Sequence, residues 1–397
     1  METNNTLVIN LRDELCSRCS VCRSACPFEA ISQVEDKIVV DTTKCMVCGI
    51  CSSACPSGII TPYYYSYNEL VEKLKREMTP RTTDLVVACR GSTDPLLQSP
   101  SAMSELDTRK AVLLRVPCVG RLSPIFYMTA LSMGIQRIVA IQCKEDFCRF
   151  TKGSLVNRGR LTMLGNLVRS FGYPNGTVSI IEGAKQVEYD TAKCVGCDKC
   201  VHACPYQAIE AQALATPKIN YEKCTGCGAC TVVCPHLALE IRGYECTSMA
   251  EVIKDYSKRV KKTKAGAPAI LVLCCQWAEF PNLDRNEKGL IRPNVALLEI
   301  PCFSKLDPIN VLQAFVYGFD GVLAFACSDT DCKSKESRIT TENNVNVLIT
   351  TGLKSMGLSD RFKIHKSSPR TIGDFDAQVD LFVNTILLQE KKIGTKE

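Results

Sequence analysis

The sequence predicts two small, cysteine-rich α+β modules that alternate with two α/β domains, each built on a mainly parallel sheet. Three observations predict this architecture. Sixteen cysteines form four runs in two pairs, short apolar segments alternate with longer amphipathic ones after each pair, and this order occurs twice. With 397 residues, 46% of them hydrophobic, the chain can form several packed cores. We expect domains over residues 1–66, 67–182, 183–245 and 246–397.

Each cysteine run reads Cys-x2-Cys-x2-Cys-x3-Cys-Pro, the spacing of bacterial two-cluster ferredoxins. In such a module, three thiolates of one run bind a [4Fe-4S] cluster and the fourth binds the cluster of the partner run. This rule predicts four ligand sets: Cys16, Cys19, Cys22 and Cys55; Cys45, Cys48, Cys51 and Cys26; Cys194, Cys197, Cys200 and Cys234; Cys224, Cys227, Cys230 and Cys204. Zinc is disfavoured because this is not a zinc-finger spacing. The runs therefore predict ferredoxin modules that carry electrons through four [4Fe-4S] clusters.

The first run differs from the others by a cation, Arg18, between its first two cysteines. A positive charge there would raise the reduction potential of the nearby cluster, because it favours the more negative, reduced state. The other interpretation is a solvent-facing side chain, which is the more common situation for an arginine. Both interpretations remain open from the sequence.

The segment after each ferredoxin module begins with a helix followed by a strand, Asn68–Arg90 in the first half and Ala250–Gln276 in the second. Short apolar runs predict buried strands, and longer amphipathic stretches predict helices. The first half is expected to contain strands Leu85–Cys89, Val112–Cys118, Arg137–Cys143 and Thr177–Glu182, with helices Ser123–Gly134 and Gly153–Gly172. The second is expected to contain strands Ala269–Cys275, Val295–Cys302, Gly321–Cys327 and Phe362–Lys366, with helices Asp307–Gly318, Lys335–Met356 and Phe375–Gln389. This alternation predicts a flavodoxin-like, mainly parallel sheet in each domain.

A second set of cysteines recurs at the predicted strand ends of both α/β domains. They are Cys89, Cys118, Cys143 and Cys148 in the first half and Cys275, Cys302, Cys327 and Cys332 in the second. Ligand sites of parallel sheets form at the carboxyl ends of the strands, so four thiolates there predict a metal site, [2Fe-2S] or zinc. We favour [2Fe-2S], because the rest of the chain is devoted to electron transfer. The alternative is that cysteine is a common buried residue. The last three cysteines keep the spacing Cys-x24-Cys-x4-Cys in both halves, which argues against that alternative.

Composition excludes several classes of function. The formal charge of +6 counts cysteines as neutral, whereas six clusters with four thiolates each would take it to roughly −6. The basic residues then balance bound anions, and we expect no nucleic-acid partner. No uncharged apolar run is long enough to span a membrane, and the N-terminal residues lack the pattern of a secretory signal. We therefore expect a reducing, cytoplasmic environment.

No residue is a candidate for substrate chemistry, so we expect no catalytic residues. The sequence has neither a Gly-x-Gly-x-x-Gly dinucleotide motif nor a Gly-x4-Gly-Lys-Ser/Thr phosphate loop. None of its three histidines forms a Cys/His nucleophile pair on sequence grounds. The two remaining cysteines, Cys246 and Cys274, are interpreted as packing residues. Cys274 precedes Cys275 on one strand, so its side chain should face the opposite way.

The strand-end cysteines carry a resemblance to a known family. The pattern consists of a strand-end Cys, then Val116–Arg121 (VPCVGR), then a strand-end Cys-x4-Cys. This pattern resembles the delta subunit of F420-non-reducing (methyl-viologen-reducing) hydrogenase. The resemblance covers about Asp84–Ser170 and Pro268–Leu358, and the second copy of the motif, Ile300–Lys305, has diverged more. The chain also lacks two features of the family: the His and Gly of a C-H-x-G-D-C element, and a second cysteine at the first strand end.

The resemblance implies a [2Fe-2S] centre in each α/β domain. Members of that family link a hydrogenase or formate dehydrogenase to the flavin-containing protein of heterodisulfide reductase, its A component. By resemblance, the chain would belong to a hetero-oligomeric, heterodisulfide-reductase-associated complex of an anaerobe, with methanogenesis or related energy metabolism as its setting.

We therefore expect an electron-transfer subunit with four [4Fe-4S] clusters and one or two [2Fe-2S] clusters, without substrate chemistry of its own. It would relay electrons between a hydrogenase, formate dehydrogenase or ferredoxin and a heterodisulfide-reductase-type flavoprotein. The alternative is a catalytic iron–sulfur reductase that acts on a small disulfide at a strand-end cysteine site. That reaction requires an open coordination position or a redox-active cysteine pair. An iron–sulfur sensor is disfavoured, because no helix-turn-helix is evident.

Overall fold

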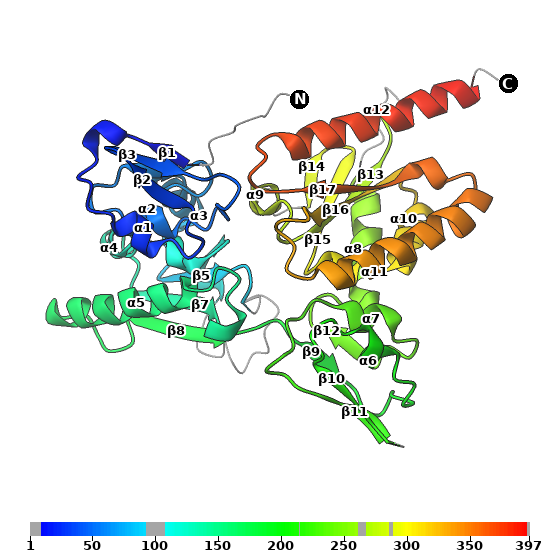
Figure 1. Cartoon of the computed structure of the whole chain (residues 1–397), viewed down its shortest axis with the longest axis horizontal. Helices are drawn as coiled ribbons and strands as arrows, with labels where there is room; N and C mark the ends of the chain where they lie inside the picture. Colours follow the sequence, from blue (N-terminus) through cyan, green and yellow to red (C-terminus); the bar gives the residue numbers. More distant parts are fainter. Residues whose placement is uncertain (1–8, 93–107, 214, 261–266, 286–288, 395–397) are drawn as a thin grey trace. The chain divides into compact units, whose positions relative to one another are not determined.

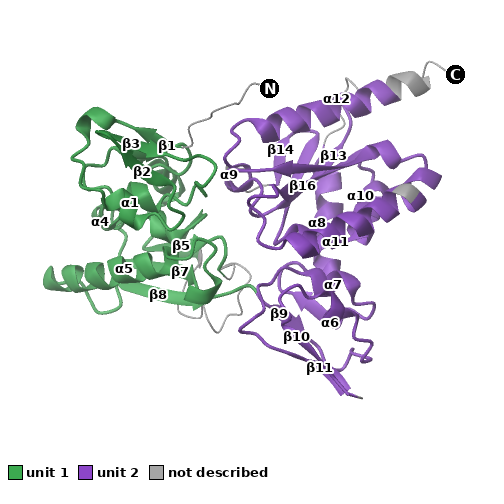
Figure 2. Ribbon diagram, viewed as in Figure 1, with its two compact units in different colours: residues 1–185 green, residues 186–397 purple. Residues whose placement is uncertain are grey.

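The computed structural model describes residues 9–92, 108–213, 215–260, 267–285 and 289–394. The chain divides into two compact units, Met1–Lys185 and Gln186–Glu397 (Figures 1 and 2). Each unit begins with a small module of short helices and short strands and continues into a sheet flanked by longer helices. The same order of elements therefore occurs in both units.

Two short helices and two antiparallel strand pairs form each module. In unit 1 they are α1 (Val21–Ala25), α2 (Ile50–Ala54), the pair β1 (Ile9–Leu11) and β4 (Ile60–Pro62), and the hairpin β2 (Ile31–Val34) and β3 (Lys37–Val40). In unit 2 they are α6 (Lys199–Ala203), α7 (Ala229–Val233), the pair β9 (Val187–Tyr189) and β12 (Leu239–Ile241), and the hairpin β10 (Ile209–Gln212) and β11 (Ala215–Ile219). Each helix follows a residue in the left-handed conformation and ends at the fourth cysteine of its run, whose backbone is extended. The proline after that cysteine disfavours a helical conformation there.

The sheet of unit 1 has four parallel strands in the order β6-β5-β7-β8. They are β5 (Asp84–Cys89), β6 (Ala111–Val116), β7 (Arg137–Cys143) and β8 (Val178–Gly183), with helices α3 (Tyr67–Glu77), α4 (Pro124–Ser132) and α5 (Gly153–Ser170). Every residue of the central strand β5 is buried, which explains the apolar run Leu85–Cys89 that follows its first residue, Asp84. Because β5 and β7 pair directly, the strand ends that carry Cys89 and Cys143 lie side by side.

The sheet of unit 2 has five strands in the order β14-β15-β13-β16-β17, of which only β14 is antiparallel to its neighbour. They are β13 (Ile270–Cys275), β14 (Leu290–Arg292), β15 (Val295–Ile300), β16 (Gly321–Cys327) and β17 (Phe362–Ser367). The helices are α8 (Cys246–Arg259), α9 (Phe280–Arg285), α10 (Pro308–Val316), α11 (Lys335–Val347) and α12 (Asp374–Gly394). Strands β13 and β16 are buried throughout and form the centre of the core.

Three details differ from the sequence prediction. Cys118 and Cys302 lie two residues beyond β6 and β15, each directly before a 3-10 turn, rather than on the strands themselves. The helix predicted over Lys335–Met356 changes at Leu348–Leu353 into a π-helical turn. Strand β14 and helix α9 have no counterpart in the prediction, because both are short and lack a periodic apolar pattern.

Both sheets are mainly parallel, as predicted. In each unit the parallel strands follow the chain order second, first, third, fourth, which is also how a flavodoxin-like sheet begins. The flavodoxin-like assignment itself stays a prediction. Among the helices that the structure describes, none combines the length and apolar character needed to cross a bilayer.

Candidate metal centres

The first predicted ligand set of unit 1 surrounds one cavity. Cys16, Cys19, Cys22 and Cys55 all line one small pocket, whose apolar wall includes Ile38. Cys55 comes from the second run, so the structure brings the two runs together in the crossed arrangement that the spacing predicts. Burial, and the nearby sulfur atoms of Cys55, Cys16 and Cys19, raise the pKa of the Cys22 thiol.

The equivalent set of unit 2 has the same arrangement. Cys194, Cys197, Cys200 and Cys234 line one small pocket. Burial and the charges of Cys234 and Cys194 raise the pKa of Cys200 to about 11. We call these two sets the outer sets.

Arg18 faces the outer set of unit 1. Its guanidinium donates to both carboxylate oxygens of Asp13, at 2.7 and 3.2 Å. Its pKa is raised, first by a hydrogen bond to the Cys16 sulfur and then by Asp13. Arg18 therefore contacts a predicted ligand, and Asp13 balances part of its charge.

The other two sets, which we call the inner sets, are more deeply buried. In unit 1, burial raises the pKa of Cys48 to about 12, and the charges of Cys45 and Cys26 add to the effect. The pKa of Cys51 rises for the same reason, with Cys48, Cys45 and Cys26 as its charged neighbours. Three buried thiols and the partly exposed Cys26 lose their protons together only if a cation compensates the charge, and the irons of a cluster are such cations.

The inner set of unit 2 shows the same pattern. Burial raises the pKa of Cys227 to about 12, and the pKa of Cys230 rises with Cys227, Cys224 and Cys204 as neighbours. Cys200 of the outer set is a further neighbour of Cys230. The two sets of this module are therefore adjacent.

Backbone amides also point at sulfur atoms. The amides of Ala208 and Ala238 donate to Cys204 and Cys234, both at 3.3 Å, and the Gly196 amide lies 3.5 Å from Cys194 Sγ. Hydrogen bonds of this kind stabilise thiolate charge and tune the potential of a bound cluster. The donor sets of both modules fit [4Fe-4S] clusters.

The four strand-end thiols of unit 1 form a closed ring. Cys89 Sγ lies 3.4 Å from Cys143 Sγ and also contacts Cys118. Cys148 contacts both Cys118 and Cys143, which completes the ring. All four are buried; the most exposed is Cys148, at 6%.

The pKa values of neighbouring thiols in this ring shift in opposite directions. Hydrogen bonds from Cys118 and Cys143 lower the pKa of Cys89 and bring that of Cys148 to about 2. The same hydrogen bonds raise the pKa of Cys118 and Cys143, which act as donors. The amides of Phe150 and Ser154 further lower the pKa of Cys148. Four buried cysteine sulfur atoms in mutual contact form a donor set that suits a metal with four thiolate ligands.

Gly153, the first residue of α5, makes room for this ring. A β-carbon at Gly153 would lie 2.2 Å from Cys118 Sγ and 3.4 Å from Cys148 Sγ. A β-carbon at Gly120 would in turn lie 2.7 Å from the Gly153 carbonyl oxygen. Within the described ranges, no group of three or more His, Cys, Asp or Glu side chains is already spaced to hold a single metal ion. The ring therefore consists of thiol–thiol contacts.

The strand-end set of unit 2 is less regular. Cys275 Sγ lies 3.6 Å from Cys327 Sγ and contacts Cys302. Cys302 also lies 3.5 Å from the hydroxyl of Ser304, which occupies the position of Gly120 in unit 1. Burial raises the pKa of Cys332. The charge of Cys302 raises this pKa further, whereas the positive charge of Arg338 lowers it. Three thiols are thus in contact, and the fourth lies beside them.

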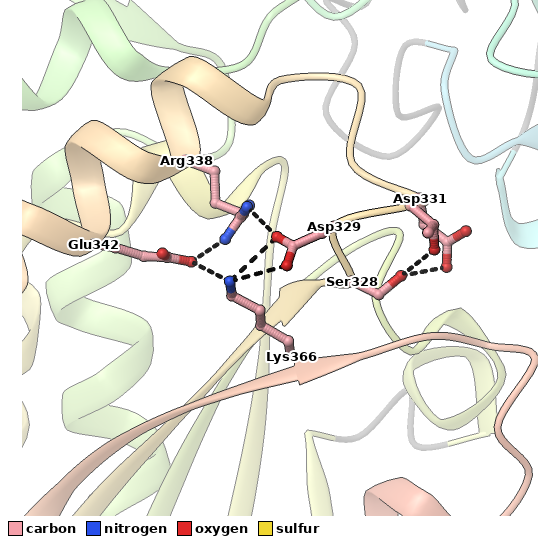
Figure 3. A network of polar contacts seen from close by, with 7 residues as sticks. Ser328, Asp329, Asp331, Arg338, Glu342 and Lys366 are labelled. Atoms are coloured by element: carbon pink, nitrogen blue, oxygen red, sulfur yellow. Dashed lines mark hydrogen bonds and ion pairs between the residues drawn. The ribbon is translucent and has the colours of Figure 1, made fainter.

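An ion-pair network fixes the loop that carries Cys332 (Figure 3). The guanidinium of Arg338, whose side chain is 3% exposed, bonds to Asp329 and Glu342. Lys366 on β17 reaches Asp329 at 3.2 Å and Glu342 at 3.9 Å. The hydroxyl of Ser328 bonds to Asp331 at 2.9 Å. No sequence motif predicted this network, because its members come from a loop, a helix and a strand.

Comparison with known proteins assigns the α/β parts of the chain. The family model for the delta subunit of methyl-viologen-reducing hydrogenase matches the chain twice, over residues 85–195 and 270–388. The chain belongs to this family. Models for [4Fe-4S] domains match the cysteine runs: a dicluster domain over residues 187–241 and binding domains over 38–61 and 13–29. This member of the delta-subunit family is therefore also a [4Fe-4S] protein.

Three curated relatives are similar to this delta-subunit protein. It is 30% identical over 67 residues to the D-type iron-sulfur protein of the F420-non-reducing hydrogenase vhc of Methanococcus voltae, covering 16% of this chain and 46% of that protein. It is 30% identical over 73 residues to the D-type iron-sulfur protein of the F420-non-reducing hydrogenase of Archaeoglobus profundus, covering 17% of this chain and 52% of that protein. It is 31% identical over 199 residues to the A component of the ferredoxin/F420H2-dependent CoB-CoM heterodisulfide reductase of Methanosarcina acetivorans, covering 50% of this chain and 24% of that protein. The chain thus spans about half of the two hydrogenase proteins and about a quarter of the reductase component.

The structure brings the predicted site residues of this delta-subunit protein together as described, and it leaves two cysteines outside the sets. Cys274 is fully buried, and its sulfur contacts the carbonyl oxygen of Cys275 at 3.5 Å. Cys246 begins α8 and is partly exposed. The sequence prediction missed Gly153 and Arg121, although the VPCVGR motif that contains Arg121 was the available signal.

Proposed function

We propose that the chain relays electrons through four [4Fe-4S] clusters, bound by the two outer and two inner sets, and through a [2Fe-2S] cluster at one or both strand-end sets. One observation carries this proposal: in both units the inner set adjoins the strand-end set. In unit 2 the charge of Cys302 helps to raise the pKa of the Cys227 thiol. In unit 1 the guanidinium of Arg121 interacts with both Cys48 and Cys118.

Equivalent contacts support this adjacency in each unit. Phe28 follows the Cys-Pro that ends the first run, and its ring packs edge-on against Phe150 with centroids 6.3 Å apart. Tyr206 occupies the same position in unit 2 and bonds to Ser334. Phe150 and Ser334 both lie two residues after the last strand-end cysteine. The duplication has therefore kept the place where the module meets the sheet.

The protein residues would hold the clusters and control their surroundings. Bound clusters supply one-electron redox chemistry at low potential. The thiolates fix each centre, and the amides of Ala208 and Ala238 stabilise negative charge. Burial keeps water from Cys48 and Cys51 of the inner set and from the strand-end set of unit 1. Within each unit the proposed order is outer set, inner set, strand-end set.

The relatives suggest the partners. One is named as part of a heterodisulfide reductase and two as hydrogenase iron-sulfur subunits. We propose that the chain works in a complex with a heterodisulfide-reductase A-like flavoprotein and a hydrogenase or formate dehydrogenase. The proposed setting is the cytoplasm of an anaerobe, in methanogenesis or related energy metabolism.

Burial favours a relay over a reductase at the strand-end site. A reductase must let its substrate reach a sulfur or metal atom, whereas Cys118 and Cys143 of unit 1 are at most 1% exposed. In unit 2, Cys275 and Cys327 are buried as well. Electrons can enter such a site without a substrate, because they tunnel between neighbouring centres.

Anaerobic purification with iron and acid-labile sulfide counted per chain tests the proposal. We expect about 20 irons if both strand-end sets hold a [2Fe-2S] cluster, and about 16 if neither does. The variants Cys89→Ser and Cys148→Ser should lose the [2Fe-2S] electron paramagnetic resonance (EPR) signal together with electron transfer from a hydrogenase to a flavoprotein acceptor. Variants that keep every cluster but lose disulfide reduction would show that the chain is a reductase instead.

A further inference from the structure

A cationic side chain lies at the same place in both units, three residues after the second strand-end cysteine. It is Arg121 in unit 1 and Lys305 in unit 2, each at the end of the 3-10 turn that follows Cys118 or Cys302. Both are buried, at 6% and 3% exposure. A charged side chain is rarely this buried without a specific role, because removal from water is costly.

Each cation packs on a glycine of the inner run. A β-carbon at Gly49 would lie 2.8 Å from Nη2 and 2.9 Å from Nε of Arg121. A β-carbon at Gly228 would lie 2.8 Å from Cβ and 3.0 Å from Cδ of Lys305. Both glycines precede the third cysteine of their run by two residues and have positive φ angles, +78° and +86°. The inner run thus presents bare backbone to the cation.

Neutral groups accept only some of the hydrogen bonds that the guanidinium of Arg121 can donate. Nη2 donates to the Tyr64 carbonyl oxygen at 2.8 Å, and the group lies 4.9 Å from the ring centre of Tyr65. Nη1 is buried and has no hydrogen-bond partner among the residues that the structure describes. The thiols that interact with its charge are Cys48 and Cys51 of the inner set and Cys118 of the strand-end set.

We propose that Arg121 sets the reduction potential of the inner cluster of unit 1, and that Lys305 has the same role in unit 2. This inference rests on the proposed function. Reduction adds one negative charge to a cluster, and a buried cation stabilises that charge more strongly than a solvated one would. The cation therefore raises the potential of the inner cluster and favours the passage of an electron from the outer cluster to the inner one.

The two units should differ in the size of this effect. Arg121 turns its charged head toward Gly49, whereas Lys305 packs on Gly228 with the carbon atoms of its stem. Lys305 also interacts with the carboxylate of Asp307, which balances part of its charge. We expect the potential of the inner cluster to depend more on Arg121 than on Lys305.

The test uses the full-length chain, purified anaerobically with its clusters, and the variants Arg121→Met and Lys305→Met. Arg158→Met is the matched control: Arg158 is on α5 of the same unit and pairs with Glu182. Each protein is titrated with dithionite in the presence of mediators, and the [4Fe-4S]+ signals are followed by EPR.

We expect Arg121→Met to lower the reduction equilibrium constant of one [4Fe-4S] component about tenfold, which is about 59 mV for one electron. Lys305→Met should give a smaller shift and Arg158→Met none, with iron per chain unchanged in all three. A wild-type iron content with an unshifted titration in Arg121→Met would overturn the inference and leave the relay intact.

A second variant distinguishes an effect of Arg121 on the reduction potential from an effect on folding. If Arg121→Met loses iron, Arg121→Gln, which keeps N–H donors without the charge, should retain the clusters and show the shift. Loss of iron in both variants would mean that Arg121 holds the fold, and the inference would be wrong. A wild-type chain without iron would contradict the proposed function itself.

Discussion

Gly153 shows how much of a strand-end site depends on one missing side chain. The sulfur atom of Cys118 occupies the space that a side chain at position 153 would need, because it would lie 2.2 Å from a β-carbon there. The same helix carries Gly159, whose β-carbon position has no atom within 4 Å apart from its chain neighbours and the backbone of the helix itself. These two glycines of α5 therefore form a matched pair for testing the ring of thiols.

We expect Gly153→Ala to displace Cys118 and to lose the strand-end cluster of unit 1, about two irons per chain. Gly159→Ala should keep all iron and stabilise the helix by up to about 1 kcal/mol, because alanine has the higher helix propensity. Iron content and thermal unfolding measure both effects. A Gly153→Ala protein with full iron content would contradict the role of Cys118 as a ligand.

At the scale of the element, strand β13 separates two adjacent cysteines. Successive side chains of a strand point to opposite faces of the sheet. Cys275 contacts Cys302 and Cys327, whereas the Cys274 sulfur contacts the carbonyl oxygen of Cys275. Alternation along β13 thus assigns one cysteine to the strand-end set and the other to packing.

We expect Cys275→Ala to reduce the iron content and Cys274→Ala to leave it unchanged. Both substitutions remove one buried sulfur, so their cost in packing should be similar, about 1–2 kcal/mol. Iron analysis and urea unfolding of the two variants make the comparison. Equal loss of iron in both would show that iron content follows stability instead of ligation.

At the scale of the whole molecule, cluster binding should reverse the sign of the net charge. The chain alone has a formal charge of +6. Each oxidised cluster with four thiolates adds about −2, so four clusters give about −2 and six give about −6. Anaerobic isoelectric focusing before and after reconstitution should show this shift. A loaded protein that remains basic would mean that most of the sets do not bind clusters.

The local sites could be predicted from the sequence, and the distant contacts could not. Three cysteines of each ferredoxin run are neighbours in the sequence, so their spacing alone identifies the ligand set. Cys89 and Cys143 meet only because β5 and β7 are adjacent parallel strands, which strand–helix alternation predicts in outline. The contact of Arg121 with Gly49 depends on how the module packs on the sheet, and no periodicity encodes that packing.

The burial of the thiol ring has a consequence for the order of biosynthesis. Cys118 is fully buried, and the first residue of α5 covers it. A protein that delivers a cluster could not reach this sulfur in the closed state. Because metal binding at such a site contributes free energy to folding, iron delivery to this ring has to precede the docking of α5. A chain synthesised under iron limitation would then close over four unmetallated thiols, and the ring could load afterwards only if α5 moved away again.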